Sequence, residues 1–388
     1  MSKFFALKFS DTIGLTSLAN KMANNINEGR IAHAQMFVGE DGSEALALAR
    51  AYVSYILCSD KTDNDSCGKC PACLKMEKLS HPDVHWIFPA AGFGDASGKQ
   101  GQDQLIAQYQ QSWREAMLHH PYLLYQQWLS LSGEEKKKLD IGKVMAEYLF
   151  GKMSLKSYEG GMKIAVIWRP ELMNAKAANT LLKIIEEPPA KSLFILVSTN
   201  VDDVLGTISS RTQITRIPKA DNEKFAAWMS EKLQINPQSA DTIAFAADGN
   251  IGKGLAMARE IGGENEIFVL FRAWMRLCFS RDLAGLKQWI NDNSKLSRDL
   301  LSGLLQYGLQ IVYSSLNVVV RQQEPKLINP AEKEFIKKFA PFVDSERASA
   351  YYALFNEAIG DIKWNGNAKI ILSDLSFKFM MLLHQKKD

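Results

Sequence analysis

The sequence predicts two kinds of architecture in one chain: an α/β domain built on a parallel sheet, followed by segments that are entirely helical. Three observations support this prediction. Short apolar runs alternate with helix-like segments over residues 1–218, an order that buries a parallel sheet beneath helices on both faces. From residue 219 onward only helical patterns occur. Near the start, a glycine-spaced turn separates an apolar run from an Ala/Leu-rich helix, which is the layout of a phosphate-binding loop.

Each element of the α/β part follows from the apolar pattern. We expect helices over 12–30, 43–57, 141–150 and 173–186, and strands over 35–38, 84–88, 163–168 and 193–198. The last of these helices should stop at Pro188-Pro189, because proline lacks the N–H that a helix interior needs. Residues 90–140, rich in Gln, Trp and Tyr, are predicted to form an inserted helical hairpin on a surface loop. Its aromatic side chains are expected to pack the hairpin itself rather than to stack on bases.

The chain's length and charge limit its class. A length of 388 residues allows two or three domains. We expect an α/β domain at 1–218, a small helical lid at 219–262 and a C-terminal helical domain at 263–388. The net charge of +3 provides no global basic field, so any DNA contact must come from a local patch. The apolar runs are shorter than a membrane span and we find no signal peptide, so we expect a cytoplasmic protein without a membrane partner.

The phosphate-binding loop has the right layout and the wrong chemistry. Against the pattern G-x-x-x-x-G-K-[ST], Gly39 and Gly42 fit the early positions, but Glu44, Ala45 and Leu46 replace the last glycine, the lysine and the hydroxyl residue. That lysine normally reaches the β and γ phosphates and the hydroxyl holds Mg²⁺. The carboxylate of Glu44 is expected to point where the phosphate charge would lie. The sequence therefore predicts a loop that does not hydrolyse ATP.

Four of the five cysteines lie close together, at Cys58, Cys67, Cys70 and Cys73. Four thiolates suit tetrahedral Zn²⁺, and a site with four cysteine ligands is closed, so it stabilises a loop rather than activating water. We therefore predict a structural zinc module over 58–73. The alternative is a group of reduced structural cysteines. The fifth, Cys278, is expected to be a buried small hydrophobic residue.

A second motif lies around the strand at 163–168. Trp168 and Arg169 end this strand, where Mg²⁺-dependent hydrolysis would need acidic residues. The helix that follows reads Asn-Thr-Leu-Leu-Lys-Ile-Ile-Glu-Glu-Pro-Pro over 179–189. Together with the four cysteines, His81-Pro82-Asp83 and Ser209-Ser210-Arg211, this motif resembles the AAA+ subunits of the bacterial replicative clamp loader. The resemblance covers about 1–90 and 140–260.

The resemblance implies an AAA+, RecA-like sheet domain with a zinc module, a helical lid and a C-terminal collar domain. It implies a role in DNA replication within DNA polymerase III. The implied partners are the gamma/tau and delta subunits, the sliding clamp and, through the complex, primer–template DNA.

Within that family, motor subunits carry a lid arginine where this chain has Gly252. Three nucleotide-handling features are thus absent while Ser210 and Arg211 remain, a combination similar to the non-hydrolysing class of subunit. The resemblance implies that Arg211, with Ser210, is an arginine finger acting in trans. Glu186 and Glu187 are expected to form a solvated helix end, and Asn200 to have a structural role.

Two other functions stay open. The chain could be an active gamma/tau-like ATPase with a divergent loop, in which Lys163 or Arg169 replaces the missing cation. It could also be a free-standing, zinc-stabilised DNA-binding module. That function predicts strong salt-dependent DNA binding, which the net charge of +3 does not favour.

Overall fold

The computed structural model describes residues 8–94, 98–133, 139–260, 266–321 and 330–384. The chain divides into two compact units, Met1–Asp221 with Asn250–Gly252, and Asn222–Gly249 with Lys253–Asp388. The expected lid residues therefore fall mostly within the same unit as the C-terminal helices. The boundary that we expect at 262 lies outside the described residues and stays a prediction.

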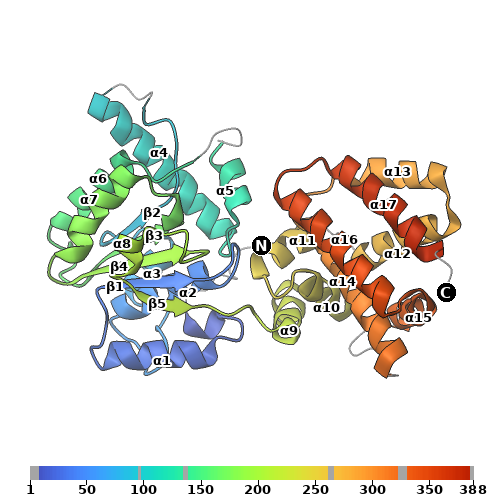
Figure 1. The fold of residues 1–388 in the computed structure, drawn as a ribbon. Coiled ribbons are helices and arrows are strands. Elements are labelled where there is room, and N and C mark those ends of the chain that lie inside the picture. Colours follow the sequence, from blue (N-terminus) through green and yellow to red (C-terminus); the bar gives the residue numbers. More distant parts are fainter. Residues whose placement is uncertain (1–7, 95–97, 134–138, 261–265, 322–329, 385–388) are drawn as a thin grey trace. The chain divides into compact units, whose positions relative to one another are not determined.

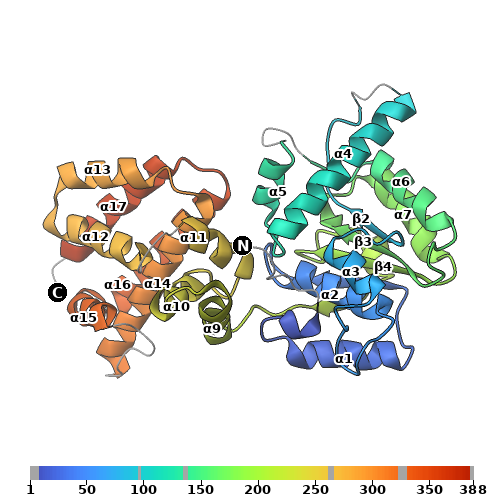
Figure 2. The same ribbon diagram turned by 180° about the vertical axis from the view of Figure 1, so that it is seen from behind.

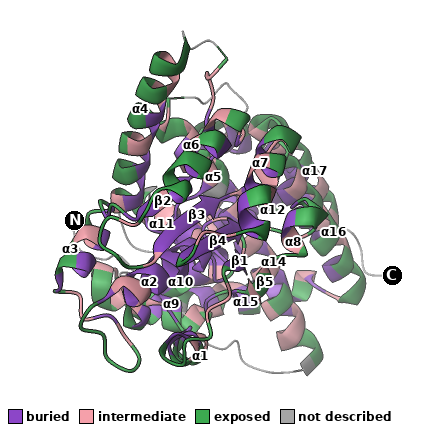
Figure 3. Cartoon of the chain, turned by 90° about the vertical axis from the view of Figure 1, so that its left-hand side faces the viewer, coloured by how far each residue is buried: buried purple, intermediate pink, exposed green. Residues whose placement is uncertain are grey.

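The first unit is built on a five-stranded parallel sheet with the strand order β2-β3-β4-β1-β5. The strands are β1 (Ala34–Val38), β2 (Val84–Ile87), β3 (Lys163–Trp168), β4 (Ser192–Ser198) and β5 (Gln213–Arg216). Every residue of β1, β3 and β4 is buried, because helices cover both faces of the sheet (Figure 3). Continuous burial explains the unbroken apolar runs that predicted these strands.

Strand β5 was not among the expected strands. Three of its four residues are exposed and none is fully buried, so it has no apolar run to mark it. Its position is set by pairing: Ile214 lies opposite Met36 of β1 at the sheet edge.

Helices complete the first unit (Figures 1 and 2). They are α1 (Thr16–Asn27), α2 (Ala45–Leu57), α3 (Pro71–Glu77), α4 (Gly98–His119), α5 (Tyr125–Leu131), α6 (Lys143–Ser154), α7 (Ala175–Glu186) and α8 (Gly206–Ser209), with short 3-10 turns at Phe9–Asp11 and Pro170–Leu172. Helix α2 packs against β1, β3 and β4, whereas α6 contacts β2, β3 and α7. Helix α7 begins where Asn174 accepts a hydrogen bond from the Ala177 N–H and ends before Pro188-Pro189, as expected from capping and from proline.

The insert at 90–140 forms helices α4 and α5, but it is not a self-contained surface hairpin. Trp113 and Trp128 are 1% and 0% exposed and belong to the core of the first unit. The Trp113 ring stacks on Phe88, just beyond β2, with 4.5 Å between centroids, and lies 5.2 Å from Trp168 at the end of β3. The expectation of an independently packed hairpin is therefore wrong: its aromatic residues extend the core beyond the strand ends.

The second unit is helical throughout its described residues. Its helices are α9 (Asn222–Leu233), α10 (Pro237–Ala246), most of α11 (Ile251–Glu260), α12 (Glu266–Ser280), α13 (Leu283–Asn293), α14 (Arg298–Arg321), α15 (Pro330–Phe339), α16 (Ser345–Lys363) and α17 (Ala368–His384), with a 3-10 turn at Ala340–Phe342. Cys278 is buried here, as expected. Among the described helices, none combines the length and hydropathy needed to cross a membrane.

Candidate functional site

The phosphate loop (residues 39–44) lies at the carboxyl end of β1 and leads directly into α2. Two of its backbone N–H groups donate to carbonyl oxygens of the chain itself. The Gly39 N–H donates to Ser198 O at 3.1 Å, and the Ser43 N–H donates to Glu40 O at 2.9 Å. The Ala45 N–H faces Ser43 Oγ at 3.4 Å. A phosphate-binding loop directs its N–H groups at the ligand, so these donors are not available to a phosphate.

Glu44 does not present a charge to an open phosphate position, contrary to expectation. Its side chain is only 1% exposed, and Oε1 accepts a hydrogen bond from the Ile13 N–H. The other oxygen, Oε2, is buried without a hydrogen-bond partner. Burial raises the pKa of Glu44 to about 8, partly offset by the Ile13 hydrogen bond, so the carboxyl is mostly protonated at neutral pH. Ala45 and Leu46 are also buried.

Two segments cover the tip of the phosphate loop, and we call them the cover segments: residues 122–125 from the insert and residues 250–252. The Gly252 N–H donates to Gly42 O, and Asn250 Nδ2 donates to Asp41 O, both at 2.8 Å. The Tyr125 N–H donates to Asp41 Oδ2 at 2.9 Å. All these residues belong to the first unit.

The packing at the cover segments leaves no room for added atoms. A Cβ at Gly252 would lie 2.5 Å from Tyr122 O and 2.7 Å from Gly42 Cα. A Cβ at Gly42 would lie 2.5 Å from Leu124 Cδ2. Position 252, where motor subunits of the resembling family carry an arginine, is thus in backbone contact with the loop.

Arg169 joins the end of β3 to the phosphate loop. It adopts a left-handed backbone with φ +63°, and its Nη1 lies 3.6 Å from Asp41 Oδ1. Its Nε lies 3.5 Å from Glu171 Oε1, and its guanidinium covers the Tyr125 ring at 4.8 Å. The cation is therefore matched by carboxylates of its own chain at the place where a nucleotide site would hold Mg²⁺ and phosphates.

Lys163, the other candidate for a substitute cation, lies at the first residue of β3. Its ammonium donates to three carbonyl oxygens, those of Lys152, Leu155 and Lys156, at 2.6–3.1 Å. The phosphate loop follows the last residue of β1, and β1 and β3 are parallel strands of one sheet. Lys163 is therefore at the amino end of the parallel strands, opposite to the end that carries the loop, and does not reach the loop.

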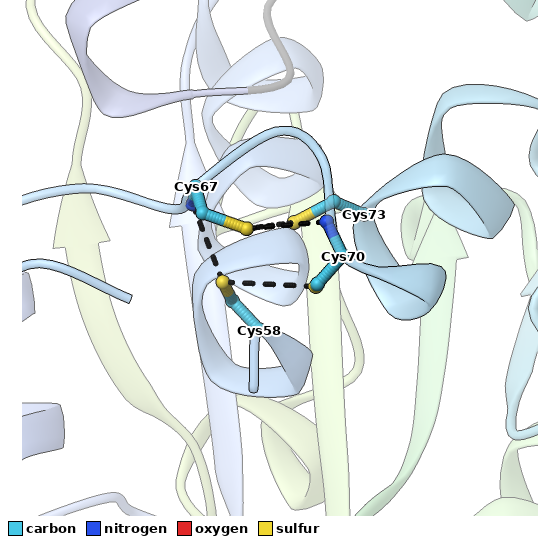
Figure 4. A group of neighbouring side chains, drawn as sticks. All are labelled: Cys58, Cys67, Cys70 and Cys73. Carbon is cyan, nitrogen blue, oxygen red and sulfur yellow. Dashed lines mark hydrogen bonds between the residues drawn. The ribbon is translucent and has the colours of Figure 1, made fainter. Parts of the chain in front are cut away.

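The four predicted cysteines converge between α2 and α3 (Figure 4). Their Sγ atoms all lie within 4.8 Å of one another, with 4.0 Å between Cys67 and Cys73 and 3.9 Å between Cys58 and Cys70. Tetrahedral zinc with Zn–S bonds of about 2.3 Å places its sulfur atoms about 3.8 Å apart. Backbone N–H groups of Cys67 and Cys70 point at Cys58 Sγ and Cys67 Sγ, each at 3.3 Å, as suits thiolates. The cluster can hold a metal ion.

Arg211 lies on the surface after α8, with 42% of its side chain exposed. Its Nη2 forms an ion pair with Glu186 Oε1 at 2.7 Å, and its Nη1 donates to Thr207 O at 2.9 Å. Glu186, expected to be a solvated helix end, is the exposed last residue of α7 and in addition forms this ion pair. Asn200 accepts a hydrogen bond from the Asp202 N–H, in keeping with a structural role.

Sequence reasoning missed the residues that close the loop. Asp41, Leu124, Tyr125 and Asn250 are distant in sequence and carry no motif. One usable signal was the apolar run Tyr122-Leu123-Leu124-Tyr125 inside a polar insert, because an apolar run in such a setting has to be covered.

The strand order, the loop at the end of β1 and the glutamate-proline helix α7 define an α/β protein whose phosphate-binding loop pattern lacks its lysine and hydroxyl residue and is covered by segments of its own chain. Residues 14–221 match the family model described as "DNA polymerase III, delta subunit". The chain belongs to this family, and with it to the clamp-loader subunits.

The chain is similar to curated relatives that are delta' subunits and to one that is a tau subunit. DNA polymerase III subunit delta' of Escherichia coli is 23% identical over 61% of this chain and 58% of that protein. Subunit tau of Bacillus subtilis is 22% identical over 97% of this chain and 62% of that protein. Subunit delta' of Bacillus subtilis is 24% identical over 63% of this chain and 57% of that protein. The chain thus spans about three-fifths of the length of these relatives.

A solved structure from Thermotoga maritima, a DNA polymerase III gamma subunit-related protein, is 13% identical, with 94% of this chain and 99% of that chain covered and a TM-score of 0.39.

Proposed function

We propose that the chain is a non-hydrolysing, delta-prime-type subunit of the DNA polymerase III clamp loader, working in the cytoplasm. In this role it is a stator: it does not turn over ATP but donates Arg211 to the ATP site of a neighbouring motor subunit. Its partners would be the gamma/tau and delta subunits, the sliding clamp and, through the complex, primer–template DNA. The four-cysteine cluster would hold a structural Zn²⁺.

One observation carries this proposal. The phosphate loop lacks its lysine and hydroxyl residue, and the two cover segments fill the space over its tip. Arg211, in contrast, is on the surface with 42% of its side chain exposed. ATP hydrolysis is thus disfavoured at the chain's own loop, whereas Arg211 is accessible to the ATP site of a neighbouring subunit. An arginine supplied in trans stabilises the charge that builds up on the transferring phosphoryl group.

The test is a reconstituted loader with gamma and delta subunits. We expect Arg211→Ala to lower its DNA-stimulated kcat about tenfold or more, because a finger acts in the transition state. Arg211→Lys should not restore the rate, since an ammonium lacks the planar fork of donors. Arg216→Ala, which removes another exposed arginine on β5, is the matched control. Unchanged ATPase with Arg211→Ala would refute the finger.

The second candidate is an active, gamma/tau-like ATPase with a divergent loop. It is favoured by the similarity to Bacillus subtilis subunit tau over 97% of this chain. Calorimetric titration of the isolated chain with Mg²⁺-ATP separates the two functions. A non-hydrolysing subunit with a covered loop should show no binding, whereas micromolar binding or turnover would support the ATPase.

A further inference from the structure

Arg211 is held in one position by its own chain. Glu186, the last residue of α7, accepts its Nη2 at 2.7 Å. On the other side, Nη1 donates to Thr207 O at 2.9 Å and to Ser210 Oγ at 3.4 Å. The guanidinium is therefore held between the end of α7 and the short helix α8, two elements that also contact each other.

The end of α7 that carries Glu186 is anchored in the core, although the Glu186–Arg211 pair is on the surface. Ile184 and Ile185, next to Glu186, are 4% and 1% exposed and belong to the core of the first unit, so the end of α7 cannot move freely. The C-terminal end of a helix carries partial negative charge, which adds to the attraction for a cation. Glu186 and Arg211 side chains remain 47% and 42% exposed.

The guanidinium keeps donors for an outside ligand. Arginine has five N–H donors, and Glu186, Thr207 and Ser210 take three of them. Two N–H groups are left on a half-exposed side chain. A phosphate oxygen from outside can accept them without displacing Glu186.

We propose that Glu186 is the positioning residue of the arginine finger: it fixes the Arg211 guanidinium in the orientation in which it meets the phosphates of the neighbouring subunit. This inference rests on the proposed function. A long, flexible side chain loses conformational entropy when it is fixed against a ligand. Because Glu186 already orders Arg211 in the free subunit, less entropy is lost when Arg211 meets the phosphates. Preorganisation of this kind stabilises the transition state without strengthening substrate binding.

The test again uses the reconstituted loader, now with Glu186→Ala. We expect kcat to fall about two- to fivefold, the range of an exposed ion pair, while KM for ATP stays within about twofold. Glu187→Ala is the matched control, because Glu187 is adjacent in sequence and is not the partner of Arg211. Circular dichroism and gel filtration of each variant confirm folding and assembly.

A double-mutant cycle decides the mechanism. In an Arg211→Ala background, Glu186→Ala should change nothing further, because its effect acts only through Arg211. Equal losses in both backgrounds, an unchanged kcat, or a higher kcat with Glu186→Ala would each overturn the positioning role. The two proposals fail separately: if Arg211→Ala has no effect the finger is wrong, whereas if only Glu186→Ala has no effect the finger stands.

Discussion

At the scale of single residues, Glu44 shows how burial can decide what a carboxyl group does. It takes the place of a loop glycine, yet it faces the Ile13 backbone rather than solvent. With one oxygen lacking a hydrogen-bond partner, the charged form is costly, and the pKa rises to about 8 from its ordinary value of 4.5. The residue is therefore a neutral part of the core at pH 7 and an ionised, destabilising one in alkali.

This residue predicts a pH dependence of stability. Between pH 4.5 and 8 the folded chain keeps a proton on Glu44 that the unfolded chain releases, so its contribution to stability is present below pH 4.5 and is lost as the pH rises through 8. Glu44→Gln should remove this loss. At pH 9 we expect the variant to be more stable than the parent by on the order of a few kcal/mol, and at pH 5 nearly equal.

Urea unfolding at pH 5, 7 and 9, with zinc held constant, measures the difference. Glu231→Gln, an exposed substitution, is the control and should leave the pH profile unchanged. Identical profiles for the parent and Glu44→Gln would mean that Glu44 is not protonated in the fold.

At the scale of elements, helices α4 and α5 are structural supports of the strand ends. The Trp128 indole N–H donates to Pro89 O at 2.8 Å, and its ring meets Phe88 edge-on at 5.1 Å. The same insert supplies one of the two cover segments. The insert, which the sequence predicts to be a surface hairpin, therefore contributes buried residues to the core and covers the phosphate loop.

Truncating this support should be costly. We expect Trp128→Ala to reduce the free energy of unfolding by about 3–5 kcal/mol, because the ring is 0% exposed and its loss leaves a cavity and an unpaired carbonyl. Leu131→Ala on the same helix, at 47% exposure, should cost less than about 1 kcal/mol. Chemical unfolding of both variants makes the comparison. Equal, small costs would place the insert outside the core.

We expect the four-cysteine cluster at the α2–α3 connection to hold a metal ion that stabilises this segment. We expect about one zinc per chain purified under reducing conditions, because four thiolates form a closed tetrahedral site. Cys67→Ser should lose most of that zinc and lower the melting temperature, whereas Cys278→Ser, far from the cluster in sequence and in the other unit, should keep the zinc. Elemental analysis gives the content. A metal-free parent chain would show that the cysteines are only structural.

At the scale of the whole molecule, the nucleotide loop is closed by segments about 80 and 210 residues further along the chain. If the chain is the proposed non-hydrolysing subunit, the loop's own substitutions and the cover segments are two separate obstacles to ATP binding. Restoring one should therefore not restore function. Two explanations for a loop that does not bind ATP can therefore be separated. In the first, the loop lacks the side chains that bind phosphate and Mg²⁺; in the second, the cover segments occupy the space that ATP would need.

Restoring the loop pattern by substitution tests whether the cover segments alone exclude ATP. The triple variant Glu44→Gly, Ala45→Lys, Leu46→Thr rebuilds the loop pattern in sequence. We expect no ATP binding below about 1 mM, since residues 122–125 and 250–252 still cover the loop. Calorimetry on the folded variant, verified by circular dichroism, gives the answer. Micromolar binding would show that the covering is loose and that side-chain chemistry alone disabled the site.

The features that the sequence predicted are those set by local patterns, and the features that it missed depend on contacts between residues far apart in the chain. Strands β1, β3 and β4 were predictable because burial on both faces leaves an apolar run, and the cysteine cluster because its spacing is local. Strand β5 was not, since pairing with β1 defines it and its side chains are mostly exposed. The burial of Glu44 and the Arg169–Asp41 contact depend on residues far apart in the chain, which no local pattern records.

Gly252 determines which side chains the covered loop can accept at this position. Any side chain there begins with a Cβ 2.5 Å from Tyr122 O and 2.7 Å from Gly42 Cα, distances that only a backbone shift can relieve. A Gly252→Arg substitution is therefore blocked by shape before its charge matters. An arginine at this position would require the cover segment to move first. If the chain is the proposed stator, no single substitution at position 252 would turn it into an ATPase.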